Sequence, residues 1–198
     1  MKNLFTPANS VMLLVDHQVG TIKLAGSTPY DELVRNTRAL ARTAVEIGMP
    51  LILTSSQEER FQGLLLDDLK IIAPEAYAAR IKRPGVVDSW MYAPFRDAVV
   101  ATGRKKLIMA GLTNDVCMVY PAISAVQDGY DVQLVADAGG SPTQMADEIS
   151  LNRMAANGVV VTSTNQIMAE LATDWANPTG AAIQRIMYEE ILKRLVEA

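Results

Sequence analysis

Residues 106–121 read KLIMAGLTNDVCMVYP and join a short apolar run to the expected start of a helix. The run at 107–110 has the length and composition of a buried parallel strand. Gly111 then marks a break, and the three residues at 113–115 are all types that cap helix N-termini. Cys117, the only cysteine, follows where the helix should begin. Backbone N–H groups and the helix dipole favour a thiolate there, so the stretch predicts Cys117 as a nucleophile.

Strand-length apolar runs and helical patterns alternate along the whole chain. Strands are expected at 11–15, 51–54, 79–82, 107–110, 132–136 and 159–162. Helices are expected at 31–47, 64–72, 92–102, 117–127, 141–156 and 167–171. This spacing is typical of right-handed βαβ crossovers. The sequence therefore predicts an α/β fold of three layers, with a parallel sheet covered by helices on both faces.

The 198 residues contain neither an internal repeat nor a linker, so residues 1–198 are expected to form one domain. A helix at about 180–197 carries a broad apolar stripe formed by Ile183, Ile186, Met187, Ile191, Leu195 and Val196. Such a stripe must be covered. The helix is expected to pack on its own domain or to reach another subunit, and both alternatives stay open.

Charge and cysteine content limit the partners and the compartment. The net charge is −4 and no basic run occurs, which argues against nucleic acid and anionic membrane surfaces as partners. A single cysteine fits a reducing compartment. The N-terminus lacks the pattern of a signal peptide, and no apolar run has the length of a membrane span. The chain is therefore expected to be cytoplasmic. The low charged fraction, 20%, fits subunit association but also a large core.

Three reactive side chains follow the ends of predicted strands, namely Asp16, Arg83 beside Lys82, and Cys117. In an open α/β sheet, ligands bind beyond the carboxyl ends of the strands. Cys117 would attack an acyl carbon, Asp16 would take the thiol proton and later activate water, and Arg83 would stabilise negative charge. A small-molecule substrate follows from this chemistry.

Each of these residues also has an ordinary structural interpretation. A lone cysteine is often a small buried hydrophobe, Asp16 would also suit a helix cap, and Arg83 would also suit a surface salt bridge. His17 is the only histidine, and a Ser-His-Asp triad built on it lacks a G-x-S-x-G motif. No convergent metal-ligand set and no phosphate-binding glycine motif occurs. No metal and no cofactor is therefore expected.

Four segments in order carry a resemblance to a known family: LLVDHQ at 13–18, RPGVVDSW at 83–90, AGLTNDVCM at 110–118 and AVQDGYDVQLVADAGGS at 125–141. Over nearly its full length the chain resembles the isochorismatase-like cysteine hydrolases, in particular the YcaC-like branch. The resemblance implies a six-stranded parallel sheet in the order 3-2-1-4-5-6. It also implies a homo-oligomer, since the branch that the chain resembles forms homo-octamers.

The resemblance also implies roles for individual residues. The family uses an Asp, Lys and Cys triad, which maps onto Asp16, Arg83 in place of the lysine, and Cys117. Its oxyanion hole uses two backbone N–H groups, here those of Thr113 and Cys117. A cis peptide bond is expected between Leu112 and Thr113. Whether Arg83 or the adjacent Lys82 supplies the cation stays open, although adjacent strand residues point to opposite faces.

Three departures from the family patterns refine the expected reaction. Asn114 stands where the family often has Thr, the histidines of the nicotinamidase metal set are absent, and true isochorismatases lack the cysteine. The resemblance thus implies a metal-independent hydrolase that cleaves a small amide or related acyl compound through a Cys117 thioester. The expected pocket walls are Gln18, Trp90, Tyr120 and Phe61, and specificity is expected in 57–66. The alternatives are nicotinamidase or isochorismatase-type activity at the same site, or an oligomeric scaffold without activity.

Overall fold

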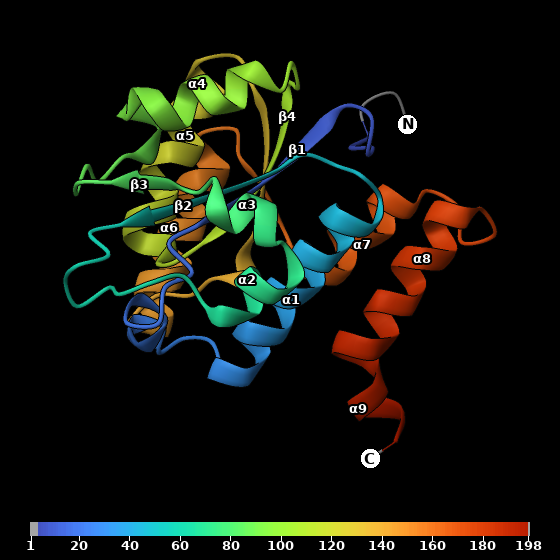
Figure 1. Cartoon of the computed structure of the whole chain (residues 1–198). Helices are drawn as coiled ribbons and strands as arrows, with labels where there is room; N and C mark the ends of the chain where they lie inside the picture. Colours follow the sequence, from blue (N-terminus) through green and yellow to red (C-terminus); the bar gives the residue numbers. More distant parts are fainter. Residues whose placement is uncertain (1–3, 198) are drawn as a thin grey trace.

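The computed structural model describes residues 4–197, which form a six-stranded parallel sheet flanked by helices (Figure 1). The strand order is β3-β2-β1-β4-β5-β6, with every neighbouring pair parallel. The strands are β1 Ser10–Val15, β2 Leu51–Ser56, β3 Ile81–Arg83, β4 Lys106–Gly111, β5 Asp131–Val135 and β6 Val160–Thr162. The predicted α/β class and the strand order are both confirmed.

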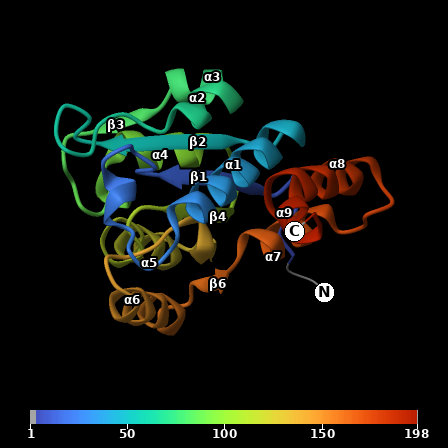
Figure 2. The same ribbon diagram turned by 90° about the horizontal axis from the view of Figure 1, so that it is seen from below.

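The helices cover both faces of the sheet, as Figure 2 shows from a second direction. They are α1 Tyr30–Glu46, α2 Asp67–Ile72, α3 Pro74–Ala78, α4 Ala93–Ala101, α5 Val119–Gln127, α6 Gln144–Ala156, α7 Thr164–Ala172, α8 Pro178–Met187 and α9 Lys193–Val196. Side chains of β1 alternate between two cores. Met12 and Leu14 pack with α1, α2, α7 and α8, whereas Leu13 and Val15 pack with α4, α5 and α6. A strand buried on both faces must be apolar throughout, which is why these runs were readable in the sequence.

The segment between β2 and β3 departs most from expectation. The expected helix at 64–72 begins only at Asp67, and a further short helix, α3, follows it with Pro74 at its first position. The strand after it is Ile81–Arg83, so that Arg83 is its last residue. The two short helices lie against the C-terminal half of α1 and β2, and they lead the chain back to the edge of the sheet.

The C-terminal segment packs on its own domain through α8 and leaves α9 largely exposed. Ile183 and Ile186 are buried against α1 and α7, and a π-helical turn, Tyr188–Leu192, joins α8 to α9. Glu190 of this turn accepts from Arg38 and Arg42 of α1. The apolar side chains at the end of the helix, Leu195 and Val196, are 64% and 71% exposed. The predicted apolar stripe is thus covered only in its first half.

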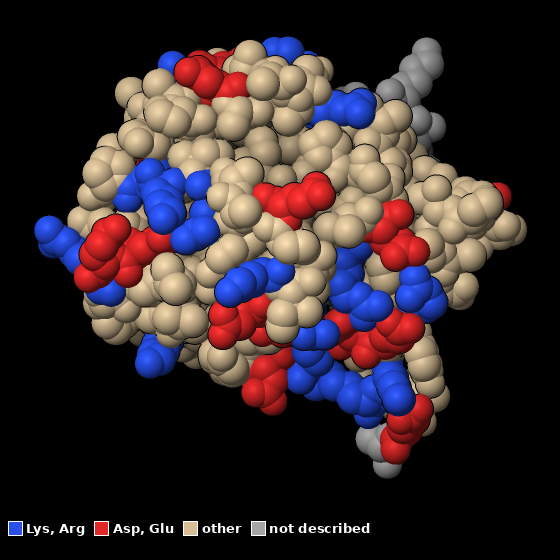
Figure 3. All heavy atoms as spheres, viewed as in Figure 1, with Lys and Arg blue, Asp and Glu red and all other residues tan. Residues whose placement is uncertain are grey.

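The surface carries both signs of charge without a large patch of one sign on the face in view. In Figure 3, Lys and Arg side chains lie interspersed with Asp and Glu over this face. Within residues 4–197, no helix combines the length and the apolar character needed to cross a membrane.

Candidate active site

Asp16 lies between a cation and a thiol at the carboxyl edge of the sheet. It directly follows β1 with a φ of +57°, a conformation that Asp adopts more readily than most residues. Nη2 of Arg83 donates to both carboxylate oxygens of Asp16, and each of these two side chains is 1% exposed. The thiol of Cys117 lines the same cavity as this carboxylate and lies close enough for the Asp16 charge to act on it. The structure thus brings the three predicted reactive residues together.

Arg83 rather than Lys82 is the cation that faces Asp16. Besides Asp16, the Arg83 guanidinium donates from Nε to Oγ1 of Thr54 at 3.0 Å and from Nη1 to the carbonyl of Val86 at 3.0 Å. Lys82, the preceding strand residue, points the other way, and its side chain is 60% exposed with Nζ 3.4 Å from Glu58. Each of the three guanidinium nitrogens of Arg83 therefore has a protein partner, and the side chain is fixed in place.

Burial sets the charge state of the thiol. It raises the pKa of Cys117 from 9.0 to about 12, and the negative charge of Asp16 acts in the same direction. The backbone of Thr113 and the charge of Arg83 oppose this rise without cancelling it. Burial also raises the pKa of Asp16 above its usual 3.8, against the pull of Arg83. Desolvation therefore outweighs the groups that were expected to favour a thiolate.

The local helix geometry also differs from the expected helix N-terminus. Cys117 lies in a π-helical turn, Asn114–Met118, that precedes α5, and its N–H donates to the carbonyl of Thr113 at 2.9 Å. The Leu112–Thr113 peptide bond is cis, as expected. The backbone of Thr113 acts to lower the pKa of the Cys117 thiol, which places it beside the sulfur. The roles of the Thr113 and Cys117 amides in an oxyanion hole stay predictions.

A cavity of about 210 Å³ opens onto Asp16 and Cys117. Its other lining residues are Thr21, Leu24, Ser56, Phe61, Gln62, Thr113 and Val116. Pockets for drug-sized ligands span roughly 300–1,000 Å³, so this cavity suits a smaller molecule. Phe61, an expected wall residue, does line it and is 61% exposed. Thr21 and Gln62 were not predicted individually, although Gln62 lies within the 57–66 segment in which specificity was expected.

Trp90 belongs to the core and not to this cavity. Its indole is buried with edge-to-face contacts to Phe95 and Tyr130, and its Nε1 donates to Oδ2 of Asp128 at 2.7 Å. The expectation that Trp90 is a pocket wall is therefore corrected. The ring packs under α4 and α5 because the turn Ser89–Met91 directs it inward, and sequence spacing alone does not reveal this direction.

Gln18 and Tyr120 also lie outside the cavity lining. Gln18 is completely buried, and its side-chain amide donates to the carbonyl of Ser56 at 2.9 Å and accepts from the Ser56 N–H at 2.8 Å. It also donates to the carbonyl of Gly63. Gln18 thus fixes the loop that carries Phe61 and Gln62. Tyr120 is 38% exposed beneath the guanidinium of Arg153, on the side of α5 that faces α6.

Asn114 and His17 support the site from outside the cavity. Nδ2 of Asn114 donates to the carbonyl of Ala136 at 3.3 Å and to Oδ1 of Asp147 at 3.1 Å, which ties the π-helical turn to its neighbours. His17 is completely buried and forms a 2.8 Å hydrogen bond from Nε2 to the carbonyl of Ala138. It does not contact the thiol's pocket. Among residues 4–197, no group of three or more His, Cys, Asp or Glu residues converges as a metal site.

His17 is expected to make stability depend on pH in the acid range. Burial lowers the pKa of His17 from 6.5 to about 4. Between these pH values the unfolded chain binds a proton that the folded chain does not, so stability falls as pH falls. The loss amounts to about 1.4 kcal/mol per pH unit. Chemical denaturation of the wild type and of His17→Gln between pH 7 and 4 measures it. Equal slopes for both proteins would contradict the assignment.

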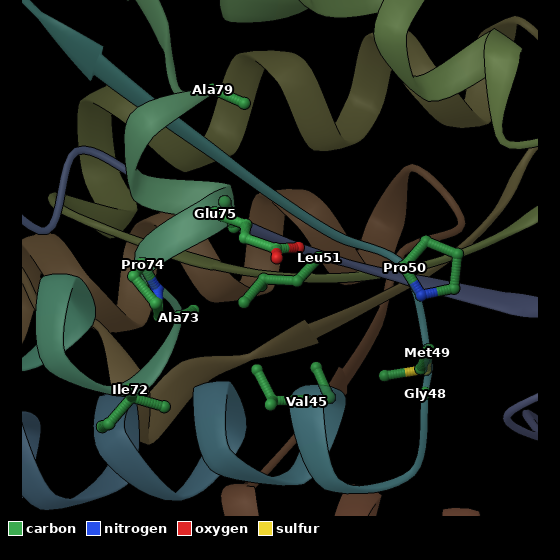
Figure 4. Close-up of a pocket in the computed structure, with 12 residues that line it drawn as sticks. Val45, Gly48, Met49, Pro50, Leu51, Ile72, Ala73, Pro74, Glu75 and Ala79 are labelled. Atoms are coloured by element: carbon green, nitrogen blue, oxygen red, sulfur yellow. The ribbon is translucent and has the colours of Figure 1, made fainter.

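A larger cavity, of about 760 Å³, lies away from this chemistry (Figure 4). It is lined mainly by apolar side chains around the end of α1, the start of β2 and α3, among them Val45, Pro50, Leu51, Ile72 and Pro74. Glu75 is its one titratable lining residue in the part of the chain that the structure describes. Because it lies at the amino end of β2, it is remote from the carboxyl edge where Asp16, Arg83 and Cys117 meet.

Comparison with known proteins assigns the chain to a family. It matches the isochorismatase domain over residues 10–166. It is 36% identical over 169 residues to "Probable hydrolase YcaC" of Escherichia coli (strain K12), covering 85% of this chain and 80% of that protein. The structure of YcaC from Pseudomonas aeruginosa with hexane-2,5-diol and covalent acrylamide superposes with a TM-score of 0.92 at 33% identity, over 100% of this chain and 97% of that one.

A second solved relative gives the same result. The Escherichia coli YcaC structure, described as an octameric hydrolase of unknown specificity, superposes with a TM-score of 0.92 at 33% identity, over 100% of this chain and 96% of that one. With Asp16, Arg83 and Cys117 meeting at the carboxyl edge of a 3-2-1-4-5-6 sheet, the chain belongs to the isochorismatase family of hydrolases and to its YcaC-like branch.

Proposed function

We propose that this hydrolase cleaves a small amide or related acyl compound through a thioester on Cys117, with Asp16 as the general base. One observation carries the proposal. The carboxylate of Asp16 is paired with the Arg83 guanidinium and lines the same small cavity as the Cys117 thiol. A carboxylate beside a thiol in one cavity is the arrangement that general-base activation of a nucleophile requires.

The first half-reaction forms the thioester. Because the resting sulfur is a thiol, its proton must leave as it attacks, and Asp16 is positioned to accept that proton. The new S–C bond turns the carbonyl oxygen into an oxyanion. The Thr113 N–H would donate a hydrogen bond to this oxyanion. The Cys117 N–H, which already donates to the Thr113 carbonyl, would be shared between that carbonyl and the oxyanion. The tetrahedral intermediate then breaks its C–N bond, and protonated Asp16 gives its proton to the departing amine.

The second half-reaction uses the same groups on water. Ionised Asp16 takes a proton from a water molecule as the water oxygen bonds to the thioester carbon. Collapse of the second tetrahedral intermediate breaks the S–C bond, and the sulfur recovers a proton from Asp16. Arg83 stays protonated throughout, so its part is to hold and stabilise the carboxylate and not to transfer a proton.

Two further facts support a small substrate and a reactive thiol. The cavity of about 210 Å³ has room for about seven molecules of water size, at roughly 30 Å³ each. The Pseudomonas aeruginosa YcaC structure contains covalent acrylamide, a small primary amide with an alkene that thiolates attack. We extend this reactivity to Cys117, the single thiol of the present chain.

Assembly into a homo-oligomer, with the octamer of YcaC as the pattern, is part of the proposal. The Escherichia coli relative is described as octameric. In the present chain, Leu195 and Val196 of α9 stay exposed after α8 has packed on its own domain. A second subunit would cover these side chains. The cytoplasmic location expected from the single cysteine also stays a prediction.

A substrate screen tests the reaction class. Purified protein is incubated with panels of small amides and hydroxamates, and release of ammonia or amine is measured beside Cys117→Ala. The proposal expects at least one compound whose hydrolysis disappears in Cys117→Ala. Hydrolysis that continues in Cys117→Ala would overturn the assigned nucleophile. Enol ethers and esters are added to the panel with product release measured by mass spectrometry, and hydrolysis confined to them would overturn the amide class.

A further inference from the structure

Two residues that line the cavity each carry a buried polar atom without a hydrogen-bond partner among residues 4–197. These atoms are Oγ1 of Thr21 and Oε1 of Gln62, and Thr21 is only 5% exposed. Leaving a buried polar atom unpaired costs about 1–3 kcal/mol, and such atoms are uncommon in folded proteins. Both line the same cavity as the Cys117 thiol. Two such atoms on residues that line one small cavity point to a ligand that supplies their partners.

A chain of hydrogen bonds fixes which end of the Gln62 amide is left unpaired. The carbonyl of Pro84 can only accept, so Gln57 must direct its NH₂ group to it, at 3.2 Å. Oε1 of Gln57 is then left to accept from Nε2 of Gln62, also at 3.2 Å. The Gln62 amide therefore has its NH₂ group engaged, and its oxygen is the atom left without a partner. The free atom of Gln62 is an acceptor, which selects a donor on the ligand.

Backbone pairing holds Thr21 and Gln62 in place. The N–H of Gly20 donates to the carbonyl of Gln62 at 2.8 Å, directly before Thr21 in the chain. A Cβ atom at Gly20 would lie 1.8 Å from the carbonyl oxygen of Phe61, so only glycine permits this approach. The two side chains are thus carried on segments that are locked to each other. Such preorganisation is what distinguishes a recognition site from loosely placed polar residues.

The cavity also selects on charge. Within residues 4–197, no Lys, Arg or His side chain lines it, and Arg83 behind it is engaged with Asp16, Thr54 and Val86. Asp16 is the charged group that does line it. An anionic substrate would lose its hydration here without gaining a cation in return. Leu24, Phe61 and Val116 supply the apolar part of the lining.

We infer that Gln62, with Thr21, determines specificity for a small uncharged substrate that carries an N–H donor, such as a primary carboxamide or ureido group. The carboxamide NH₂ donates to Oε1 of Gln62, and the Thr21 hydroxyl pairs with a second polar atom of the same molecule. This inference rests on the proposed function, since it names the substrate class for the Cys117 site.

The test compares two electrophiles that differ only at the group in question. Acrylamide carries the amide NH₂, and methyl vinyl ketone has a methyl group of similar size in its place. Alkylation rates of Cys117 are measured by mass spectrometry, and each is divided by the rate of the same reagent with glutathione. The acrylamide-to-ketone ratio in the wild type is expected to fall about 5- to 100-fold in Gln62→Met. It should fall about 2- to 10-fold in Thr21→Val.

Gln184→Met is the matched control, since Gln184 is exposed on α8, and its ratio should equal that of the wild type. A ratio unchanged in both Gln62→Met and Thr21→Val, with Cys117 still reactive, would overturn this inference and leave the nucleophile standing. If Cys117 reacts with neither reagent, the proposed nucleophile fails instead. Recognition is then judged by NMR titration with propanamide and butan-2-one, where equal affinity of the wild type for both compounds would overturn it.

Discussion

Replacement of Asp16 by Asn is expected to slow alkylation of Cys117, and hydrolysis of any amide found by screening, by about 100- to 10,000-fold. Asn has the same shape and still accepts a hydrogen bond from Arg83, but it cannot take the thiol proton. The effect is large because burial, the main cause, raises the pKa of Cys117 to about 12, so that little thiolate forms unaided at neutral pH. Rates at pH 7 by mass spectrometry measure it.

Asp128→Asn is a suitable control for this experiment. Asp128 is exposed, and its carboxylate accepts from Nε1 of Trp90 outside the cavity. Its replacement should leave the reactivity of Cys117 unchanged. If Asp16→Asn alkylated as fast as the wild type, Asp16 would not be the base, and the thiol would have to be activated by another group.

Replacement of Arg83 by Met is expected to destabilise the fold by about 3–5 kcal/mol. The Asp16 and Arg83 side chains are each 1% exposed, so loss of the guanidinium leaves a carboxylate buried without its cation. The same change removes the hydrogen bonds to Thr54 and Val86. Asp16 is then expected to take up a proton, which also removes the general base. Denaturation with urea at pH 7 measures the free energy of unfolding.

Lys82→Met provides the matched comparison one residue away. The Lys82 side chain is 60% exposed and pairs with Glu58 at 3.4 Å, so its loss should cost less than about 1 kcal/mol. If Arg83→Met and Lys82→Met both lost less than about 1 kcal/mol of unfolding free energy, the Arg83–Asp16 ion pair would not be buried as described above. A large loss for Lys82→Met alone would assign the cation to Lys82.

The sheet and the meeting of three side chains were predictable because both follow from short-range patterns. A parallel strand covered on both faces must be apolar throughout, so β1 and β4 stand out in the sequence as continuous runs. Residues that follow such strands lie at the carboxyl edge, which places Asp16, directly after β1, near Cys117, in the turn that follows β4. Alternation along β3 then leaves one of two adjacent cations facing Asp16, although the sequence did not decide which.

The pocket walls were less predictable because they depend on packing between distant segments. Trp90 was expected in the pocket, yet its ring fills the core beside Phe95 and Tyr130. Thr21 and Gln62 reach the cavity because the loops after β1 and β2 pair through Gly20. Neither the direction of a buried ring nor a pairing of two loops has a local sequence signal.

The protonation of Cys117 differs from what its position in the sequence favours, for a physical reason. The sequence places the thiol near the start of a helix, which favours a thiolate. In the fold, the thiol lies in a π-helical turn, its own N–H is bonded to Thr113, and burial raises its pKa to about 12. Desolvation depends on how tightly the surrounding elements close over the sulfur, and only the folded structure contains this information.

Acid-quench trapping tests the central claim most directly. Wild-type protein and Cys117→Ala are mixed with 4-nitrophenyl acetate, quenched in acid within the first turnover, digested and mapped by mass spectrometry. The account predicts an acetyl group on the peptide that contains Cys117, a burst of nitrophenol matching one equivalent of protein, and loss of both in Cys117→Ala. Acetylation at any other residue, or an equal burst from Cys117→Ala, would contradict the thioester mechanism.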